Sequence, residues 1–418
     1  MESPAHGCQR CYNSEIDINE EGIDLTNSTT RLPLRAWLYL NGFTFTIFGT
    51  IAVLMTFFPV YLQSLGFDKS AVGMIMAAGP VISIIANPLW GYWSDKTRNI
   101  RRTLLIMLIG NVIMVQVIFQ LSDYAWIYVA MLAFFFFQTP TFSQTTSLIL
   151  HSIESSSSRF GTFRSMGSVG WAIAAVAAAP LLQIVGIGNL GMVYSIIMLL
   201  TLGLCYGLPR GGGASRSASG SNGYGKMLRN RLFVMFLLSS IMVSIPYALN
   251  QIFVTLYVTD LGGSAWVVGW SVFASAFFEV PVFLLLDRYL RKQLGSMLLL
   301  LIAVCGLFAL RWTLMAYVAE AWQIVLVQGM QCITFGLYDY DGTQLTSLIV
   351  RPEYRASGQA MYTIAWNGIS GIIAGFLGGK IIDVWGYQSA YKAGVVFSLI
   401  GMAMFAIIRL KSKRYMLQ

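Results

Sequence analysis

Four ionisable residues lie inside long apolar stretches of the sequence: Glu279, Arg311, Asp339 and Asp341. A charged side chain at the centre of a bilayer costs about 3 kcal/mol on insertion scales unless it faces a partner or water. Because burial disfavours its charged form, a carboxylate in such a place can bind and release a proton. We expect Glu279 to be the main proton-carrying residue, followed by one of the two aspartates, with Arg311 as a balancing charge.

Helix geometry limits how these residues can act together. Asp339 and Asp341 are two residues apart, which places them about 200° apart around a helix. One of them is therefore expected to face a central cleft and the other to be paired or near water. Arg311 and Glu279 are expected to differ in depth by about 10 Å, so a direct bridge would need bending or tilt. The alternative for Arg311 is a side chain that extends to the outer membrane interface near Glu320.

The elements that hold these residues are expected to be membrane-spanning helices. The 418-residue chain is 56% hydrophobic and only 11% charged, with a mean hydropathy of +0.66, whereas about a quarter of a soluble protein is charged. Runs of about 20 apolar residues are long enough to cross a bilayer. Such runs lie near residues 35–62, 71–94, 102–121, 125–150, 163–186, 190–208, 232–259, 266–287, 294–316, 321–348, 358–383 and 389–409. We therefore predict an all-α membrane protein with twelve transmembrane helices in two pseudo-symmetric six-helix bundles.

An internal repeat relates the first six runs to the last six. A set of five residues recurs 196 residues later with every spacing kept. The residues are Tyr61, Leu65, Gly66, Val72 and Gly73, followed by Tyr257, Leu261, Gly262, Val268 and Gly269. The repeat indicates two bundles in parallel orientation that face each other across a cleft, an arrangement that transporters use for alternating access.

The Lys and Arg residues predict the orientation, because short loops rich in these residues stay in the cytosol. Almost all of them fall on one face, and only Lys69, Arg311, Lys380 and Lys392 do not fit. With an even number of spans, both termini and the central linker are predicted to be cytosolic. The expected parts are a disordered tail of residues 1–33, a bundle of residues 34–208, a Gly/Ser-rich linker of residues 209–231, a bundle of residues 232–410 and a tail of residues 411–418.

The expected cytosolic loop between the second and third runs contains a charged pattern. Gly91 is followed by Asp95 and Lys96, and two further basic residues stand at Arg101 and Arg102. A glycine permits two helices to approach closely, and an aspartate at a helix end can pair with basic groups when this side is shut. The pattern therefore suits a cytosolic gate.

A partial copy of this pattern stands in the equivalent loop of the second half. Asp287 and Arg288 are present, but Phe283 stands where the glycine would be. Arg164, at the start of the fifth run, is assigned to the same gate. We therefore expect a gate whose two halves differ.

The loop pattern resembles the signature of the major facilitator superfamily, which has a glycine, an aspartate followed by Arg or Lys, and two further basic residues. A narrower resemblance, to lactose-permease-like and phenylpropionate-permease-like symporters, rests on short motifs spread over the membrane part. These motifs begin at Arg164, Glu279, Arg311, Thr334 and Glu353. The resemblance implies a proton-coupled carrier of sugars or small aromatic or organic acids. The acids at Asp339 and Asp341 depart from this branch, which leaves their role open.

Polar and aromatic residues in facing runs are predicted to line a solute pocket. Hydrogen bonding between helices explains an isolated Asn or Gln about as well. The predicted pocket residues are Asn41 and Phe45 in the first run, Gln138 and Gln144 in the fourth, Asn250 and Gln251 in the seventh, and Trp366 and Asn367 in the eleventh.

Other classes of protein fit the sequence poorly. The net charge of +9 is scattered over short loops, so a nucleic-acid partner is not expected. Cys8, Cys11 and His6 are too few ligands for a zinc site, so no metal is expected. The segment 220–226 has the spacing of a P-loop, but Met227 replaces the Ser or Thr that binds magnesium, so no nucleotide cofactor is expected. We find no hydrolytic motif and do not expect an enzyme.

These observations lead to one hypothesis and two alternatives. We expect a monomeric secondary transporter in the plasma membrane that imports a small organic solute together with protons. Proton-driven efflux of an amphiphilic compound uses the same fold. The alternative from another class is a membrane sensor or receptor that does not transport. The expected partners are the solute, protons and the lipid bilayer.

Overall fold

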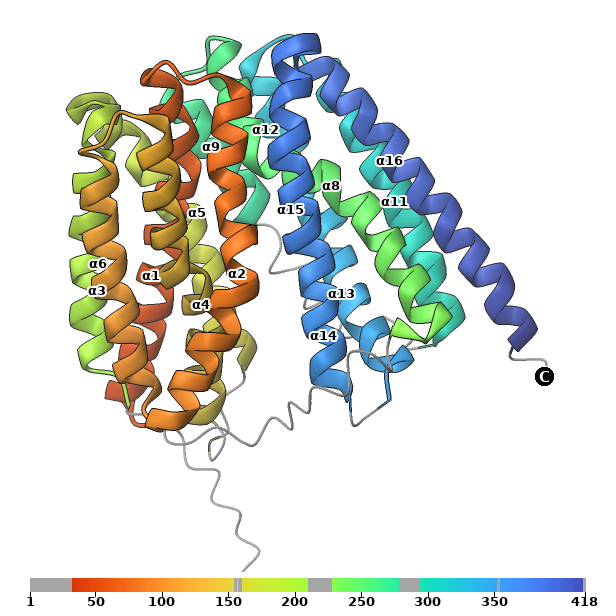
Figure 1. Ribbon diagram of the computed structural model, residues 1–418, viewed down its shortest axis with the longest axis horizontal. Coiled ribbons are helices and arrows are strands. Elements are labelled where there is room, and N and C mark those ends of the chain that lie inside the picture. Colours follow the sequence, from red (N-terminus) through yellow and green to blue (C-terminus); the bar gives the residue numbers. More distant parts are fainter. Residues whose placement is uncertain are drawn as a thin grey trace, which may run out of the picture.

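The computed structural model describes residues 32–153, 156, 160–209, 228–277, 293–351 and 354–415. Within these ranges the regular structure is helical, without β-strands (Figure 1). Nine helical segments of this part of the chain are long and apolar enough to cross a bilayer, and Ala265–Phe277 is a shorter apolar helix. The predicted all-helical class is therefore confirmed.

The first half of the described chain is built from long helices joined by short turns. Its elements are α1 (Leu34–Ser64), α2 (Lys69–Thr97), α3 (Ile100–Ile118), α4 (Tyr124–Ile153), α5 (Phe160–Val185), a short 3₁₀ turn (Ile187–Asn189) and α6 (Leu190–Tyr206). Side-chain caps fix where two helices begin, because the first N–H groups of a helix have no partner within it. Asp68 accepts a hydrogen bond of 2.7 Å from the N–H of Ala71, and Asn99 accepts one of 3.0 Å from Arg102.

The second half is less regular. Its helices are α8 (Arg231–Asp260), α9 (Ala265–Phe277), α11 (Leu294–Ala316), α12 (Ala321–Gly329), α13 (Gln331–Ile349), α14 (Arg355–Thr363), α15 (Ser370–Ile373) and α16 (Gly379–Tyr415). Two π-helical segments, Ile364–Ile369 and Ala374–Gly378, flank α15. Gly386 interrupts α16 with φ 78° and ψ 170°, so the chain rises through α14 and α15 and descends along most of α16 (Figure 1).

The bounds of the helices repeat at an interval of 196 residues. α1 and α8 end at equivalent positions, α2 and α9 begin at equivalent positions, and α4 and α13 again end at equivalent positions. The turns after α1 and α8 contain Gly66 and Gly262, whose φ angles of 89° and 77° are adopted readily only by glycine. The repeat read from five residues therefore extends to the secondary structure.

The two halves of the chain meet along two seams of small residues. At the α2 seam, α2 packs against Ala374–Gly378 and α16, and a Cβ on Gly73 would collide with the carbonyl oxygen of Gly375. At the α5 seam, α5 packs against α9, and a Cβ on Gly269 would lie 2.9 Å from the carbonyl oxygen of Ala175. Gly73 and Gly269 are equivalent residues of the repeat. Both seams therefore bring backbones together where a side chain is missing.

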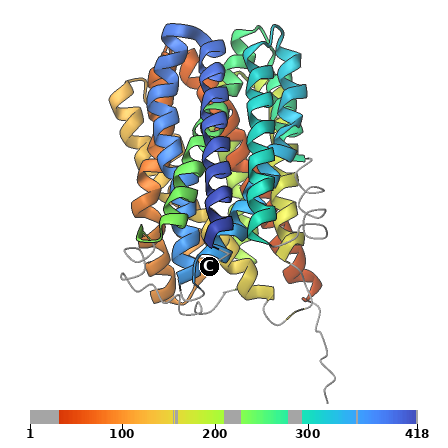
Figure 2. The ribbon, with the colours of Figure 1, turned by 90° about the vertical axis from the view of Figure 1, so that its right-hand side faces the viewer.

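The surface of the helices is apolar. Ile184, Trp126 and Leu200 are 84%, 64% and 58% exposed. Figure 2 shows the long helices running side by side along one direction. Helices that expose large apolar side chains along their length suit a lipid environment, because water would penalise such a surface. The chain is a multi-pass membrane protein.

The helix ends gather at two ends of the molecule. The basic end, at the bottom of Figure 1, carries Arg98, Arg101, Arg229 and Arg351, and the opposite end carries the turns after α1 and α8. Several predicted features lie outside the described residues. They are the tail of residues 1–31, most of the linker (residues 210–227), Glu279, Asp287 and Arg288.

Candidate functional site

Arg311 of α11 is fully buried and is held by polar side chains of the neighbouring spans. Its guanidinium donates to Gln328, to Gln331 Oε1 at 2.8 Å and to Thr334 Oγ1 at 3.3 Å. The break between α12 and α13 at Met330 lies between the two glutamines, so both amides reach the same guanidinium. The alternative in which Arg311 extends to the outer interface is therefore wrong, because the side chain is fully buried and its terminal nitrogens bond to neighbours in the protein interior.

The polar network continues from Arg311 into α8 and α16. The amides of Gln328 and Asn250 lie 3.4 Å apart, and the hydroxyl of Tyr391 donates to Asn250 Oδ1 at 3.1 Å. Asn250 is completely buried. Sequence reasoning selected Asn250 and Arg311 but missed Gln328, Gln331 and Tyr391. Two glutamines three residues apart in an apolar run were a signal for a shared polar partner on one helix face.

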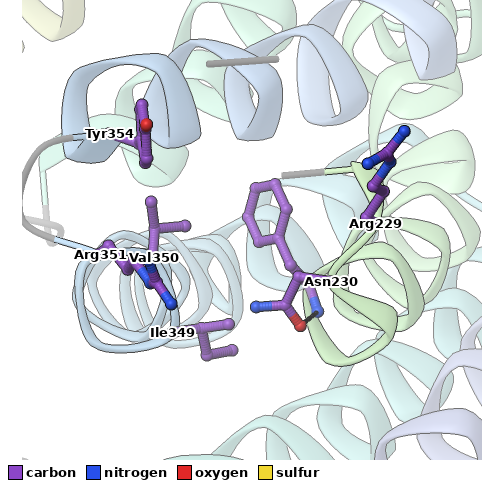
Figure 3. A pocket seen from close by; sticks show the side chains of 7 residues that line it. Arg229, Asn230, Ile349, Val350, Arg351 and Tyr354 are labelled. Atoms are coloured by element: carbon purple, nitrogen blue, oxygen red, sulfur yellow. Dashed lines mark hydrogen bonds between the residues drawn. The ribbon is translucent and has the colours of Figure 1, made fainter. Parts of the chain in front are cut away.

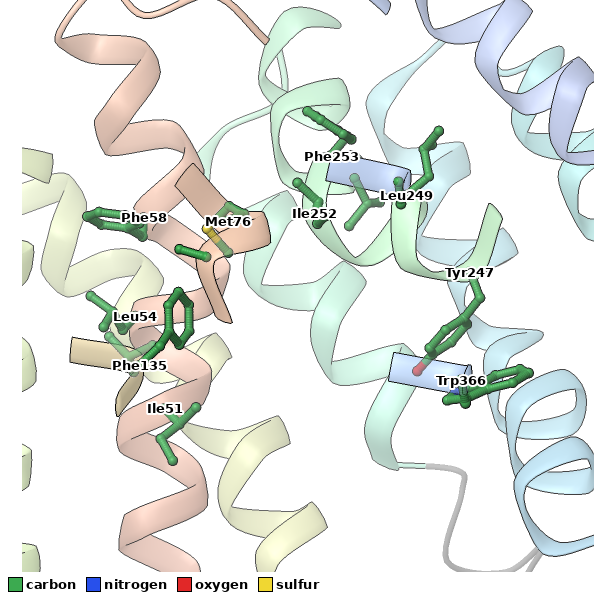
Figure 4. Close-up of a cluster of buried hydrophobic side chains, with 14 of the residues drawn as sticks. Ile51, Leu54, Phe58, Met76, Phe135, Tyr247, Leu249, Ile252, Phe253 and Trp366 are labelled. Carbon is green, nitrogen blue, oxygen red and sulfur yellow. The ribbon is translucent and has the colours of Figure 1, made fainter. Parts of the chain in front are cut away.

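Aromatic side chains pack beside this network. Tyr247 stacks on Phe335 with ring centroids 4.9 Å apart, and Tyr338 stacks on Trp366 at 4.5 Å. Tyr362 lies 6.4 Å from Trp366. Figure 4 shows the hydroxyl of Tyr247 directed toward Trp366. We call Tyr247, Phe335, Tyr338, Tyr362 and Trp366 the aromatic group.

Asp341 of α13 is buried against the aromatic group without a hydrogen-bond partner. Its exposed fraction is 0%, and neither carboxylate oxygen has a partner among the described residues. The hydroxyl of Tyr362 and the indole N–H of Trp366 also have none. Asp341 is close enough to interact electrostatically with Tyr338 and Tyr362. Buried polar groups without partners are uncommon, and they mark places where water, a proton or a ligand is held.

Asp339 lies in a different environment from Asp341. It is half-buried, and it interacts electrostatically with Arg164 of α5, in the other half of the chain. The Arg164 guanidinium carbon lies 5.1 Å from the ring centroid of Phe48. No ion pair within 4 Å joins Asp339 and Arg164 in the described structure. The two aspartates, separated by about 200° on one helix, thus have different neighbours.

The other predicted pocket residues do not join this site. Asn41 is buried in α1 and donates to the carbonyl of Trp37 at 2.9 Å. Phe45 is half-buried, with its carbonyl oxygen against Gly170, where α1 and α5 approach closely. Gln138 and Gln144 are buried in α4, whereas Gln251 and Asn367 are exposed. Of the predicted pocket residues, only Asn250 lies in the Arg311 network and only Trp366 lies in the aromatic group. A role in solute binding stays a prediction for every residue of the set.

The predicted gate residues lie at the basic end. Asp95, Lys96 and Arg102 are exposed, and a Cβ on Gly91 would meet no atom within 4 Å, so no helix approaches closely there. Arg101 donates to the carbonyl oxygens of Leu208 at 2.8 Å and Tyr206 at 3.3 Å, at the end of α6. In this structure Arg101 therefore stabilises a helix C-terminus within the first half.

Two cavities lie away from Asp341. One, of about 380 Å³, lies at the basic end, where Figure 3 shows Arg229 and Arg351 on opposite sides of it. The other, of about 120 Å³, is lined by Phe57 of α1, Leu182 of α5 and Val268 of α9 among others. Neither is lined by residues of the Arg311 network or the aromatic group.

Ionisable side chains inside membrane-spanning helices, such as Arg311 and Asp341, are rare and mark functional sites. In the comparison with known proteins, the model of the MFS_1 like family matches residues 37–393. The chain belongs to this family of the major facilitator superfamily, as the loop signature led us to expect. Its relatives are transporters, and the chain is accordingly assigned to the secondary transporters.

Two curated relatives and one solved structure illustrate the similarity. The maltose permease of Geobacillus stearothermophilus is 24% identical over 88% of this chain and 93% of its own length. The probable 3-phenylpropionic acid transporter of Escherichia coli is 22% identical over 90% of this chain and 94% of its own length. The crystal structure of the nucleoside transporter NupG has a TM-score of 0.76 at 16% identity and covers 89% of this chain and 98% of its own. This last likeness supports the fold alone.

Proposed function

We propose that the chain crosses the plasma membrane twelve times as two six-helix bundles, residues 34–208 and 232–410, with both termini and the linker in the cytosol. Eight of the nine long apolar segments account for one span each, and the ninth turns at Gly386 and accounts for two. α9 and the pair α12–α13 supply the remaining two. The 196-residue repeat supports this count. The basic end then faces the cytosol, and we propose that the transporter works as a monomer.

The solute is proposed to be a small organic molecule with a ring and polar substituents. The aromatic group offers flat faces, and the amides of Asn250 and Gln328 offer hydrogen-bond donors and acceptors beside it. The relatives include a maltose permease, a putative nucleoside transporter and a probable 3-phenylpropionic acid transporter. Sugars, nucleosides and aromatic acids all fit this description, and they define the set of compounds to test.

Asp341 is the observation that supports proton coupling most directly. An ionised carboxylate buried without hydrogen bonds would be strongly destabilised, whereas the protonated acid carries no charge. When the bundles move and water reaches this residue, the proton can leave, so the protonation of Asp341 and the position of the bundles are coupled. Glu279 stays the leading candidate from the sequence, and Asp339 with Arg164 is proposed to act at the cytosolic gate.

Uptake by proteoliposomes tests this function. The purified full-length protein is reconstituted, an inward proton gradient is imposed, and uptake of radiolabelled maltose, uridine and 3-phenylpropionate is compared with protein-free liposomes. We expect one probe to accumulate with concurrent proton entry. Asp341→Asn and Glu279→Gln should abolish accumulation driven by the gradient while leaving exchange of solute across the membrane, because exchange needs no net proton movement.

The control is Asp123→Asn, which changes an exposed aspartate at the start of α4 that caps the N–H groups of Ala125 and Trp126. It should behave as the wild type. Gradient-driven accumulation by Asp341→Asn at the wild-type rate would contradict a coupling role for Asp341. Expulsion of a loaded amphiphilic probe by the imposed gradient would favour the efflux alternative. Binding of a probe without transport or proton flux would favour a sensor.

A further inference from the structure

One carboxylate contacts helices from both halves of the chain. It lies at the end of the molecule that is opposite to the basic end. Asp260, the last residue of α8, lies 3.0 Å from Lys69 Nζ of α2. It also accepts a hydrogen bond of 2.8 Å from Gln63 Nε2 of α1 and one of 3.0 Å from the hydroxyl of Tyr387. The carboxylate thus contacts three other helices, of which α1 and α2 belong to the first half.

A second carboxylate forms hydrogen bonds across the α2 seam and caps a helix. Asp383 of α16 accepts hydrogen bonds from the backbone N–H groups of Lys69, at 3.1 Å, and Ser70, at 2.8 Å. These N–H groups belong to the first turn of α2 and have no partner within that helix. A carboxylate is also favoured there by the helix dipole. The start of α2 is therefore stabilised by a residue more than 300 positions away in the sequence.

The charges at this seam have no counterpart in the repeat. The residue equivalent to Asp260 is Ser64, and the residue equivalent to Lys69 is Ala265. An acid at the C-terminus of a helix is unfavourable by itself, because the dipole is negative there. The charge of Asp260 is therefore stabilised by Lys69 on the other side of the seam. The same ion pair explains why Lys69 lies at this end, away from most of the other basic residues.

We propose that Asp260 and Asp383 form a latch that closes the extracellular side of the transporter. The proposal rests on alternating access, because a solute site can open outward only if α1 and α2 move away from α8 and α16 at this end. Asp260 is then the residue that joins all four of these helices, and Asp383 releases the start of α2 when the latch opens. Both act by positioning helices and do not contact the solute.

The strength of the latch suits a reversible gate. The side chains of Lys69 and Asp260 are 26% and 28% exposed, so water screens their attraction. Removal of an exposed ion pair changes an equilibrium by about two- to fivefold. Loss of the Asp260 contacts and of the Asp383 cap should therefore shift the population of the open state without locking the protein in either state.

The shift can be measured without a solute. Nitroxides are attached at Ser122→Cys and Ala319→Cys, exposed positions at this end, in full-length protein that carries Cys8→Ser and Cys11→Ser. Double electron–electron resonance then gives the distance distribution in nanodiscs. We expect Asp260→Asn to increase the long-distance fraction about two- to fivefold relative to the short one. Asp383→Ala removes a helix cap and should increase it about two- to thirtyfold. The matched controls Asp123→Asn and Lys380→Gln should leave the distribution unchanged.

A charge exchange separates a specific latch from a general loss of charge. Lys69→Asp and Asp260→Lys should each increase the long-distance fraction, and the double variant should return it toward the wild-type value because the pair is restored. If the wild type, Asp260→Asn and Asp383→Ala all show the same ratio of long-distance to short-distance populations, the latch proposal is overturned. Alternating access is not contradicted by that result. A single distance in the wild type and in every variant would instead contradict alternating access.

Discussion

At the scale of single residues, the site combines buried polar groups that have hydrogen-bond partners with buried polar groups for which the described structure shows none. The two terminal nitrogens of Arg311 donate to amide and hydroxyl partners, which offsets part of the cost of burying its charge. Asp341 has no hydrogen-bond partner among the described residues, which is why we propose that its protonation responds to access of water. The proposed proton-coupled cycle uses both kinds of residue, because a fixed network preserves the site and a titrating group changes during the cycle.

Replacement of Arg311 tests the fixed network. Arg311→Met should lower the free energy of unfolding by about 2–4 kcal/mol, because the amide oxygens of Gln328 and Gln331 lose their donor inside the protein. Arg311→Lys should fall between this variant and the wild type, since an ammonium group cannot reproduce the planar donor geometry. Thermal unfolding of the purified protein in detergent measures the effect. Arg351→Met is the control and should change stability by less than about 0.5 kcal/mol, whereas an equal loss in both variants would contradict the proposed role of the network.

At the scale of elements, glycines decide where helices turn and where they touch. Gly386 interrupts α16 and reverses the chain there, with φ 78° and ψ 170° in a region that other residues avoid. Gly73 and Gly269 instead have ordinary helical backbones and allow the two halves to meet. The apolar runs on either side would form helices without these glycines, but the helices would neither reverse nor pack in this way.

The two roles of glycine predict different responses to alanine. Gly386→Ala should cost about 1–3 kcal/mol through backbone strain alone, because its Cβ would meet no atom within 4 Å. Gly203→Ala in α6 also has open space but a helical backbone, and it should be neutral or stabilising by up to about 1 kcal/mol. Thermal unfolding of both variants provides the comparison. Equal stability of the two would show that the turn at Gly386 does not require its conformation.

At the scale of the whole molecule, the two ends differ in how the halves are joined. The end that carries Asp260 has an ion pair and a helix cap across the seam. At the basic end, Asp339 and Arg164 interact without reaching ion-pair distance. This difference is what an inward-open state of the proposed cycle requires, and closing of Arg164 onto Asp339 would accompany opening of the latch.

The orientation of the molecule can be tested by cysteine labelling in intact cells. We expect Ser122→Cys to react with a membrane-impermeant maleimide added outside, because this residue is exposed at the end opposite the basic end. Thr97→Cys, exposed at the basic end, should react only after the membrane is permeabilised. Both variants are made in protein that carries Cys8→Ser and Cys11→Ser, and this background serves as the control, since Cys205, Cys305 and Cys332 are buried. Labelling of Thr97→Cys in intact cells would invert the proposed topology.

The sequence by itself determined that the protein is helical, that it lies in a membrane and that it belongs to a transporter superfamily. These properties follow from local features, since about 20 apolar residues are enough to select a spanning helix and a short loop carries the signature. The sequence also singled out Asn250, Arg311, Asp341 and Trp366, which the structure brings into one region. Their functional roles stay predictions.

Only the tertiary structure decided which polar groups meet. Gln328 and Tyr391 reach Asn250 from other helices, and Asp260 meets Lys69 from the other half of the chain. Such contacts depend on how each helix is rotated about its axis and where it crosses its neighbours. In an apolar run almost every side chain is compatible with lipid or with packing, so the local pattern does not define that rotation. The seams of small residues and the turns at glycine do define it, through contacts between segments far apart in the chain.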